Sequence, residues 1–221
     1  GGYVSYPEEA LLALIRLEAW RQGCVVVGED LGSVPPGLRE RLAEAGLLGC
    51  AVMQFEKHDS QFNHPGGYRA ATLASFATHD TATLRGWWCG WDIETRHAIN
   101  GGDDAGYRQA LARLLRDAGL LPAGLDAENP PQEADDTLAE AVHRLLARAA
   151  SSLVAVQLDD ALGHVAQQNL PGTVDEHPNW RRRYAVEAGD LAAQPGLARL
   201  AEIFAPDPAR AEPPQEMQTW P

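Results

Sequence analysis

Acidic side chains follow four short apolar segments of this 221-residue chain. The segments and their acids are residues 24–28 with Glu29 and Asp30, residues 51–55 with Glu56, residues 73–77 with Asp80, and residues 153–158 with Asp159 and Asp160. Transfer at a glycosidic bond needs carboxyl groups of this kind: one donates a proton to the leaving oxygen, and others stabilise the positive charge that develops on the sugar. Carboxylates gathered at one edge of a sheet therefore predict general acid–base chemistry on a sugar.

The same four segments are short and apolar, which is typical of strands buried in a parallel sheet. One helix is expected before the first segment, beginning at Pro7 and stopping at Gly23, and a second between the first and second segments, beginning at Pro35 and stopping at Gly46. Alternating helices and strands predict an α/β fold, and in a (β/α)8 barrel the active site lies at the carboxyl ends of the strands. Four strands are too few to close such a barrel, so the pattern predicts half of one.

The long stretch between the third and fourth segments has its own helical patterns, over residues 104–118 and 137–149, with a polar loop between them. We interpret this part, about residues 101–150, as a helical insertion on the barrel. Residues 206–221 are rich in Pro and Glu and predict a flexible tail. The predicted organisation is one catalytic unit over residues 1–205 and a tail over residues 206–221.

Composition excludes several classes of partner. The chain carries 18 Lys and Arg against 31 Asp and Glu, a formal net charge of −13, which argues against binding nucleic acid or an anionic membrane surface. No apolar run approaches the roughly 20 residues that span a bilayer. Three scattered cysteines predict neither a disulfide framework nor a metal site, and they favour the cytoplasm. His58 and His64 flank Asp59 at an irregular spacing, so no metal site is predicted there either.

Three motifs resemble those of the 4-alpha-glucanotransferases (amylomaltase or disproportionating enzyme, glycoside hydrolase family 77). They are VGEDLGSVP at residues 27–35, ATHDT at residues 77–81 followed by TLRGWW at residues 83–88, and NLPGT at residues 169–173 followed by HPNWRR at residues 177–182. The motifs occur in the order of the family, and the resemblance runs from Tyr3 to about Tyr184. It implies an α/β fold made of strands five to eight of the (β/α)8 barrel, the C-terminal half of the family's catalytic domain.

The resemblance also implies roles for single residues. Glu29 matches the family's general acid/base, and Asp80 matches the carboxylate that stabilises the oxocarbenium-like transition state and binds sugar hydroxyls. His79 matches a histidine that binds hydroxyls, and Asn169 lies in a stretch that contributes to substrate subsites. Asp30 either takes part in the site or fixes its loop. No metal or organic cofactor is required by this scheme.

Other interpretations remain open for some of these acids. Asp80 could cap a helix that begins at Thr81. Asp159 and Asp160 could hold the rim of the barrel together rather than bind sugar.

The family's nucleophile is an Asp on the fourth strand, in an Arg-x-Asp setting, and no such motif follows an apolar strand here. In this numbering it is expected before residue 1. The chain is therefore predicted to be part of a retaining enzyme that transfers α-1,4-glucan segments between maltooligosaccharides and releases glucose, and to be inactive alone. The alternatives are a non-catalytic α-glucan-binding half-barrel and a related debranching-type transferase. Because a half-barrel exposes the edges of its first and last strands, self-association is also predicted.

Overall fold

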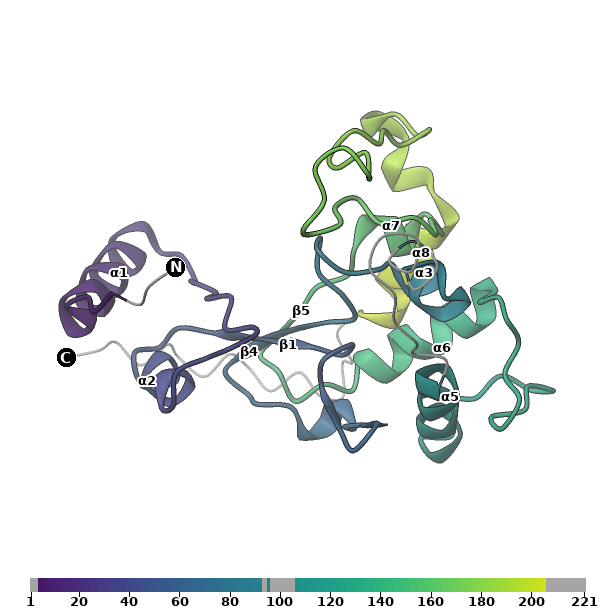
Figure 1. Ribbon diagram of the computed structural model, residues 1–221, viewed down its shortest axis with the longest axis horizontal. Coiled ribbons are helices and arrows are strands. Elements are labelled where there is room, and N and C mark those ends of the chain that lie inside the picture. Colours follow the sequence, from purple (N-terminus) through teal and green to yellow (C-terminus); the bar gives the residue numbers. More distant parts are fainter. Residues whose placement is uncertain (1–3, 93–94, 96–105, 206–221) are drawn as a thin grey trace.

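A parallel sheet lies at the centre of the computed structural model, which describes residues 4–92, 95 and 106–205 (Figure 1). Its strands are β1 (Gly49–Val52), β4 (Thr72–Ser75) and β5 (Leu153–Val154), in the order β1-β4-β5. A parallel bridge between Val27 and Leu48 adds the first apolar segment beside β1. The four predicted segments therefore lie side by side and parallel, in chain order, and the predicted α/β class is confirmed.

The strands are shorter than the apolar segments predicted. Residues 24–28 form only the Val27 bridge, and the second strand ends at Val52, three residues before Phe55. The amide of Phe55 donates to the carbonyl of Val52, so the chain turns there instead of extending. Leu158 is not in a strand but begins helix α7. An apolar run indicates that a segment is buried, and it does not indicate whether the segment is a strand. Buried turns and buried helix ends are apolar too, so the predicted strands extend too far.

Helices occupy most of the predicted positions. Their bounds are α1 (Glu8–Gln22), α2 (Leu38–Glu44), α3 (Leu84–Cys89), α5 (Gly106–Asp117), α6 (Asp136–Leu146), α7 (Leu158–Ala161) and α8 (Pro195–Ile203), with 3-10 turns at η1 (Pro65–Gly67) and η2 (Ala188–Ala193). Strands β2 (Lys57–His58) and β3 (Gln61–Phe62) form a small hairpin. Helix α1 ends at Gly23, which adopts the left-handed conformation expected of a C-terminal stop. Residues 101–105 of the predicted insertion, and the predicted tail, lie outside the described residues.

One face of the sheet packs into the main hydrophobic core. Ala51 of β1 and Ala74 of β4 lie in the same cluster as side chains of α5 and α6, including Leu111 and Leu138, which are fully buried. Burial alternates along β4, where Thr72 and Ala74 are buried and Leu73 and Ser75 are half-buried. This period of two means that the opposite face of the sheet is more open, and the candidate site lies over it.

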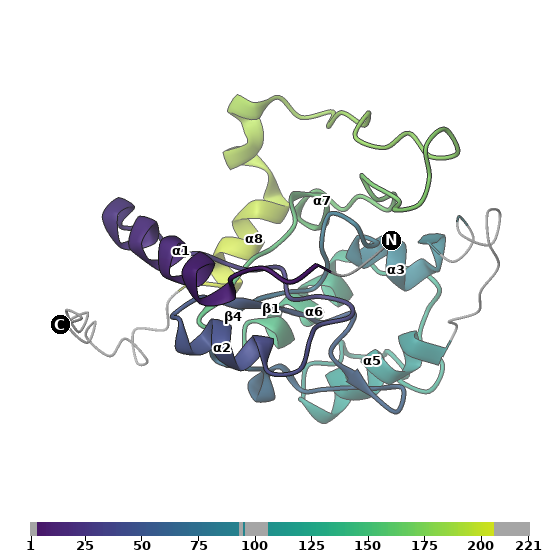
Figure 2. The ribbon, with the colours of Figure 1, turned by 60° about the vertical axis from the view of Figure 1, so that its left-hand side comes forward.

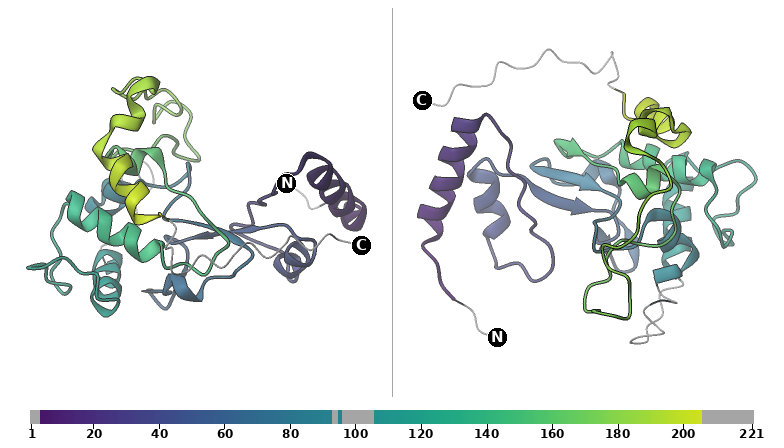
Figure 3. Two further views of the ribbon diagram at one scale, coloured as in Figure 1. Left: turned by 180° about the vertical axis from the view of Figure 1, so that it is seen from behind. Right: turned by 90° about the horizontal axis from the view of Figure 1, so that it is seen from above.

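Helix α1 stands away from the core. Figures 1 and 3 show α1 and α2 together at one end of the molecule, the sheet in the middle, and α3, α5, α6, α7 and α8 at the other end. In the turned view α1 lies at the left of the sheet, apart from α3, α5 and α6 (Figure 2). None of the side chains of α1 is buried. Leu14 is 57% exposed and Trp20 is 77% exposed.

Candidate active site

Two adjoining cavities open where the parallel strands end. The first, of about 490 Å³, is lined by the half-buried face of the sheet and by loop side chains that include Glu29, His79, Asp159 and Trp180. The second, of about 460 Å³, is lined by Glu29, Asp80, Gln54, Trp87 and Pro171, among others. Because Glu29 borders both cavities, and Thr78 and Thr81 do too, the two form one continuous site.

Glu29 is held at this edge by its neighbours in the chain. The amide of Gly28 donates to the carbonyl of Leu48 at 2.7 Å, which is the last backbone bond of the first strand segment. Directly after that bond the chain leaves the sheet, and the side chain of Glu29 is exposed in the cavity. The position predicted from its place after an apolar segment is therefore observed.

Asp80 lies in a tight turn that follows β4. Its amide donates to the hydroxyl of Thr78 at 3.2 Å, and the amide of Thr78 donates to the hydroxyl of Thr81 at 2.9 Å. Two side chains approach the same carboxylate oxygen of Asp80, Oδ1: the amide of Asn169 donates to it at 2.6 Å, and Nε2 of His79 lies 3.4 Å away. Asp80, His79 and Asn169 thus form one group, although Asn169 comes from a distant loop.

Asp80 does not cap a helix. The residue that caps α3 is Thr83, whose hydroxyl accepts from the amide of Gly86 at 3.0 Å. The alternative that Asp80 serves only as a helix cap is therefore wrong. Instead, Asp80 lines the second cavity, and 40% of its side chain is exposed.

Asp30 has a different environment from Glu29. Its side chain is 1% exposed and accepts from Arg39 Nε at 3.1 Å, from Arg69 at 2.9 Å and from the amide of Cys50 at 2.6 Å. In a regular sheet, the amide of Cys50 would donate to a backbone carbonyl of the neighbouring strand. Here the carboxylate of Asp30 accepts that hydrogen bond instead. These contacts favour the fixing of the loop over substrate binding. Sequence reasoning did not single out Arg39 or Arg69, because nothing local marks arginines that pair across the fold.

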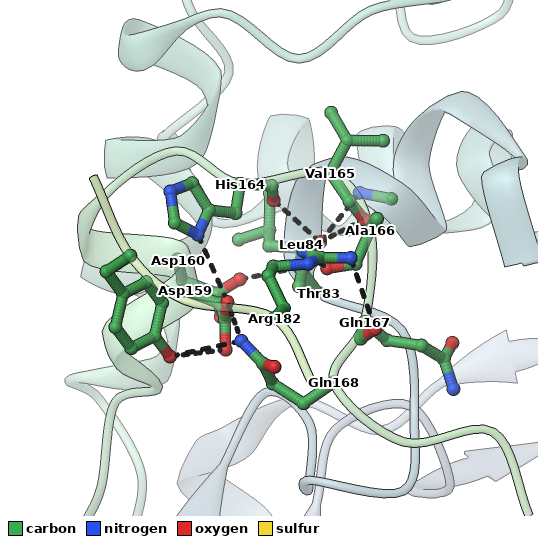
Figure 4. A network of polar contacts seen from close by, with 12 residues as sticks. Thr83, Leu84, Asp159, Asp160, His164, Val165, Ala166, Gln167, Gln168 and Arg182 are labelled. Carbon is green, nitrogen blue, oxygen red and sulfur yellow. Dashed lines mark hydrogen bonds and ion pairs between the residues drawn. The ribbon is translucent and has the colours of Figure 1, made fainter. Parts of the chain in front are cut away.

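A second polar network holds the opposite rim of the site (Figure 4). The carboxylate of Asp159 accepts from Gln168 at 3.1 Å and from the hydroxyl of Tyr184 at 3.1 Å, and it lies 3.2 Å from Nδ1 of His164. The hydroxyl of Thr83 donates to the carbonyl of His164 at 2.8 Å. The network therefore ties α3 and α7 to the loop that carries Asn169.

Asp160 is the most strongly perturbed carboxyl group of this rim. Its Oδ1 accepts from the amide of Leu84 at 2.7 Å, the residue that begins α3. Burial, reinforced by the neighbouring charge of Asp159, raises the pKa of Asp160 to about 7, although the bond from Leu84 and the charge of Arg85 act in the opposite direction. A buried acid that fixes a helix start fits the structural role that the sequence left open for it.

Carboxyl groups are the titratable side chains that Glu29 and Asp80 bring to this site. Within residues 4–92, 95 and 106–205, no group of three His, Cys, Asp or Glu side chains is arranged to hold a metal. Nor does any helix in the described part of the chain have the length and apolar character of a membrane span. The site thus holds two carboxyl side chains: Glu29 is exposed in the cavity, and Asp80 is oriented through Oδ1 by Asn169.

These features define an α/β protein with an acidic site at the carboxyl ends of its parallel strands. The sequence model of the family described as 4-alpha-glucanotransferase matches residues 1–188. The chain therefore belongs to the 4-alpha-glucanotransferase family.

Individual relatives agree with that assignment. The 4-alpha-glucanotransferase of Mycobacterium tuberculosis (strain H37Rv) is 37% identical over 191 residues, which are 82% of this chain and 26% of the relative. The Haemophilus influenzae 4-alpha-glucanotransferase is 31% identical over 195 residues, 84% of this chain and 28% of the relative. The chain thus spans about a quarter of the length of these relatives.

Solved structures show the same fold. The crystal structure of amylomaltase from Corynebacterium glutamicum superposes with a TM-score of 0.79 at 28% identity, covering 91% of this chain and 32% of that one. Amylomaltase from Streptococcus agalactiae, solved in complex with acarbose, has a TM-score of 0.61 at 24% identity, covering 93% of this chain and 36% of that one. The second likeness concerns the fold alone.

Proposed function

We propose that this chain is the C-terminal half of the catalytic (β/α)8 barrel of a retaining 4-alpha-glucanotransferase, strands five to eight. Residues 1–205 form the half-barrel, with the helical insertion at about residues 101–150, and residues 206–221 form a tail. The observation that supports this most is the continuous hollow over the open face of the sheet, with Glu29 after the Val27 segment and Asp80 after β4, two parallel strands that lie on either side of β1. In a closed barrel that face would be covered by the remaining strands.

In the proposed reaction, Glu29 protonates the glycosidic oxygen of an α-1,4-glucan while a nucleophilic Asp from the rest of the parent protein attacks the anomeric carbon. The bond to the leaving sugar breaks and a glycosyl-enzyme forms. The 4-hydroxyl of an acceptor maltooligosaccharide then attacks that intermediate, and Glu29 takes its proton. Net, one α-1,4 bond breaks and another forms, so no cofactor is consumed.

Asp80 and its partners have the second role in this scheme. A fixed carboxylate beside the anomeric carbon stabilises the positive charge of the transition state, and its stabilisation is greatest when its orientation is set in advance. Asn169 and His79 hold Oδ1 of Asp80 in that way. We assign Asn169 as a residue that positions Asp80, His79 as a ligand for sugar hydroxyls, and Asp30 as an anchor of the loop that carries Glu29.

The isolated chain has a narrower proposed activity. Because the Arg-x-Asp motif is not found in its sequence, it binds maltooligosaccharides weakly and does not turn them over. The exposed apolar side chains of α1 and the edge at Val27 lie where a complete barrel would continue, and we infer that in the isolated chain a second copy covers them. We also propose a cytoplasmic location, which the three free cysteines support.

Glucose release from maltotriose tests the proposal, with the full-length parent protein, its Glu29→Gln variant and the isolated chain measured side by side. We expect Glu29→Gln to lower the rate of the parent by orders of magnitude, and the isolated chain to release no glucose. Glu133→Gln, on the exposed loop between α5 and α6, is the matched control and should leave the rate unchanged. Normal turnover by the Glu29→Gln parent would disprove the assignment of the acid.

A further inference from the structure

Trp180 presents an exposed indole ring at the rim of the first cavity. Its side chain lines that cavity together with Glu29 and His79, and the residue is 62% exposed. The centroids of the Trp180 and His79 rings lie 5.5 Å apart with the ring planes at 43°. Since Nε2 of His79 lies 3.4 Å from Oδ1 of Asp80, the indole is next to the group that His79, Asp80 and Asn169 form.

The backbone of Trp180 is in an unfavourable conformation. Its φ is +59°, and among the described residues only Asp59 and Ser60 are other non-glycine residues with positive φ. For a bulky side chain this left-handed region is a true outlier, and outliers of this kind persist where surrounding contacts impose them, often at ligand sites. Here the amide of Trp180 donates to the carbonyl of Gln168 at 3.1 Å, which closes the loop.

The loop does not need an indole to hold this shape. Asn179 supplies hydrogen bonds within the loop: its side-chain oxygen Oδ1 accepts from the backbone amide of Leu170 at 2.8 Å, and its side-chain nitrogen donates to the hydroxyl of Thr173 at 2.9 Å. Glycine would adopt the backbone conformation at position 180 without strain. Neither core packing nor backbone preference therefore accounts for a tryptophan at this position.

We propose that Trp180 is a stacking platform for one glucosyl ring of the α-glucan, at the outer end of the site beside His79. A pyranose ring has an apolar face of C–H groups and a rim of hydroxyls, so it matches a flat aromatic side chain set among polar groups. In this position the indole binds a ring outside the bond being broken, and it governs affinity for longer substrates rather than the chemical step. The inference rests on the proposed function, since it names a binding residue of the same site.

Kinetics of the full-length parent protein with maltotriose and maltoheptaose test this role. Trp180→Gly removes the ring and relieves the backbone, while Trp180→Phe keeps an aromatic face. Val174→Ala, a 79% exposed position on the same loop, is the matched control. We expect Trp180→Gly to raise KM for maltoheptaose at least tenfold, with kcat changed less than threefold and the thermal midpoint equal or higher. Trp180→Phe and the control should keep KM within threefold of the wild type.

A purely structural role would give a different result. In that case Trp180→Gly would lower the thermal midpoint and kcat together, and this outcome would overturn the proposal, as would an unchanged KM for maltoheptaose. The proposed function is tested separately by the wild-type parent. If the wild-type parent releases no glucose from maltotriose, both the proposed function and the stacking role are refuted. A parent that releases glucose normally but tolerates Trp180→Gly would refute the stacking role alone.

Discussion

The side-chain amide of Asn169 donates a hydrogen bond of 2.6 Å to Oδ1 of Asp80, across 89 positions of the chain. Asn169 lies at the start of the NLPGT motif, and Asp80 lies in the turn after β4. The rim network around Asp159 holds the loop that carries Asn169, so this bond connects the orientation of Asp80 to the packing of α7.

This bond predicts a specific loss in the full-length parent protein. Removing the donor with Asn169→Ala should lower kcat for maltotriose roughly tenfold or more, since a hydrogen bond to a charged group is worth about 1.5–3 kcal/mol. Asn169→Asp should cost more, because it places a second negative charge against Asp80. Asn129→Ala, in the exposed loop before α6, is the control. Equal rates for Asn169→Ala and the control would show that Asp80 needs no such partner.

Gly49 is predicted to be intolerant of a side chain. A Cβ at this position would lie 2.7–2.9 Å from the carboxylate of Asp30, which is itself held by Arg39 and Arg69 and cannot easily move. Gly49→Ala should lower the free energy of unfolding by about 1–3 kcal/mol, measured by urea denaturation. Gly189→Ala, where no atom lies within 4 Å of the added Cβ, is the control.

A double-mutant cycle identifies the cause of that loss. In an Asp30→Ala background the obstructing carboxylate is gone, so Gly49→Ala should cost less than half of what it costs in the wild type. If Gly49→Ala lowers the free energy of unfolding equally in both backgrounds, the backbone conformation at position 49, and not the carboxylate of Asp30, is the reason that glycine is required.

Asp160 is predicted to make stability depend on pH. Its pKa is about 7 when folded against an ordinary value of 3.8, so between these values the folded state binds more protons than the unfolded state. The contribution to the free energy of unfolding therefore decreases as pH rises from about 4 to 7, and it is constant above that. Relative to the wild type, Asp160→Asn should gain about 2 kcal/mol between pH 5 and pH 8, because the amide does not ionise.

Urea midpoints at pH 5, 6, 7 and 8 measure this difference. Asp175→Asn, at an exposed position, should follow the pH dependence of the wild type. A constant difference between the wild type and Asp160→Asn across this range would refute the role given to burial.

The open end of the molecule predicts association of the isolated chain. Leu14, Leu17 and Trp20 of α1 are 57%, 48% and 77% exposed, and side chains of α1 border a hollow of about 620 Å³ with Val25 and Leu47. Sedimentation velocity at increasing concentration should show dimers or larger species, and Leu14→Glu with Leu17→Glu should reduce them. Val174→Glu, an exposed apolar residue outside α1, should not. A monomer at every concentration would contradict the self-association proposal.

Local patterns in the sequence were enough for the class of fold. Short apolar segments separated by helices predicted the α/β class, and the parallel pairing in chain order confirms it. Gly23 marked the end of α1 correctly. Strand ends were predicted less well, at Phe55 and Leu158, because hydropathy reports burial and does not distinguish a strand from the buried turn or helix that follows it. The family could also be predicted, because its motifs are contiguous.

The arrangement of the site was decided by tertiary structure. Sequence placed Glu29 and Asp80 after apolar segments, but only the packing of the sheet and loops brings Asn169 onto Asp80 and two arginines onto Asp30. The sequence did not identify Thr83 as the residue that caps α3, and it did not indicate the positive φ of Trp180. The physical reason is range: propensity and periodicity act over a few neighbouring residues, whereas hydrogen bonds and ion pairs between distant residues exist only once the fold has brought them together.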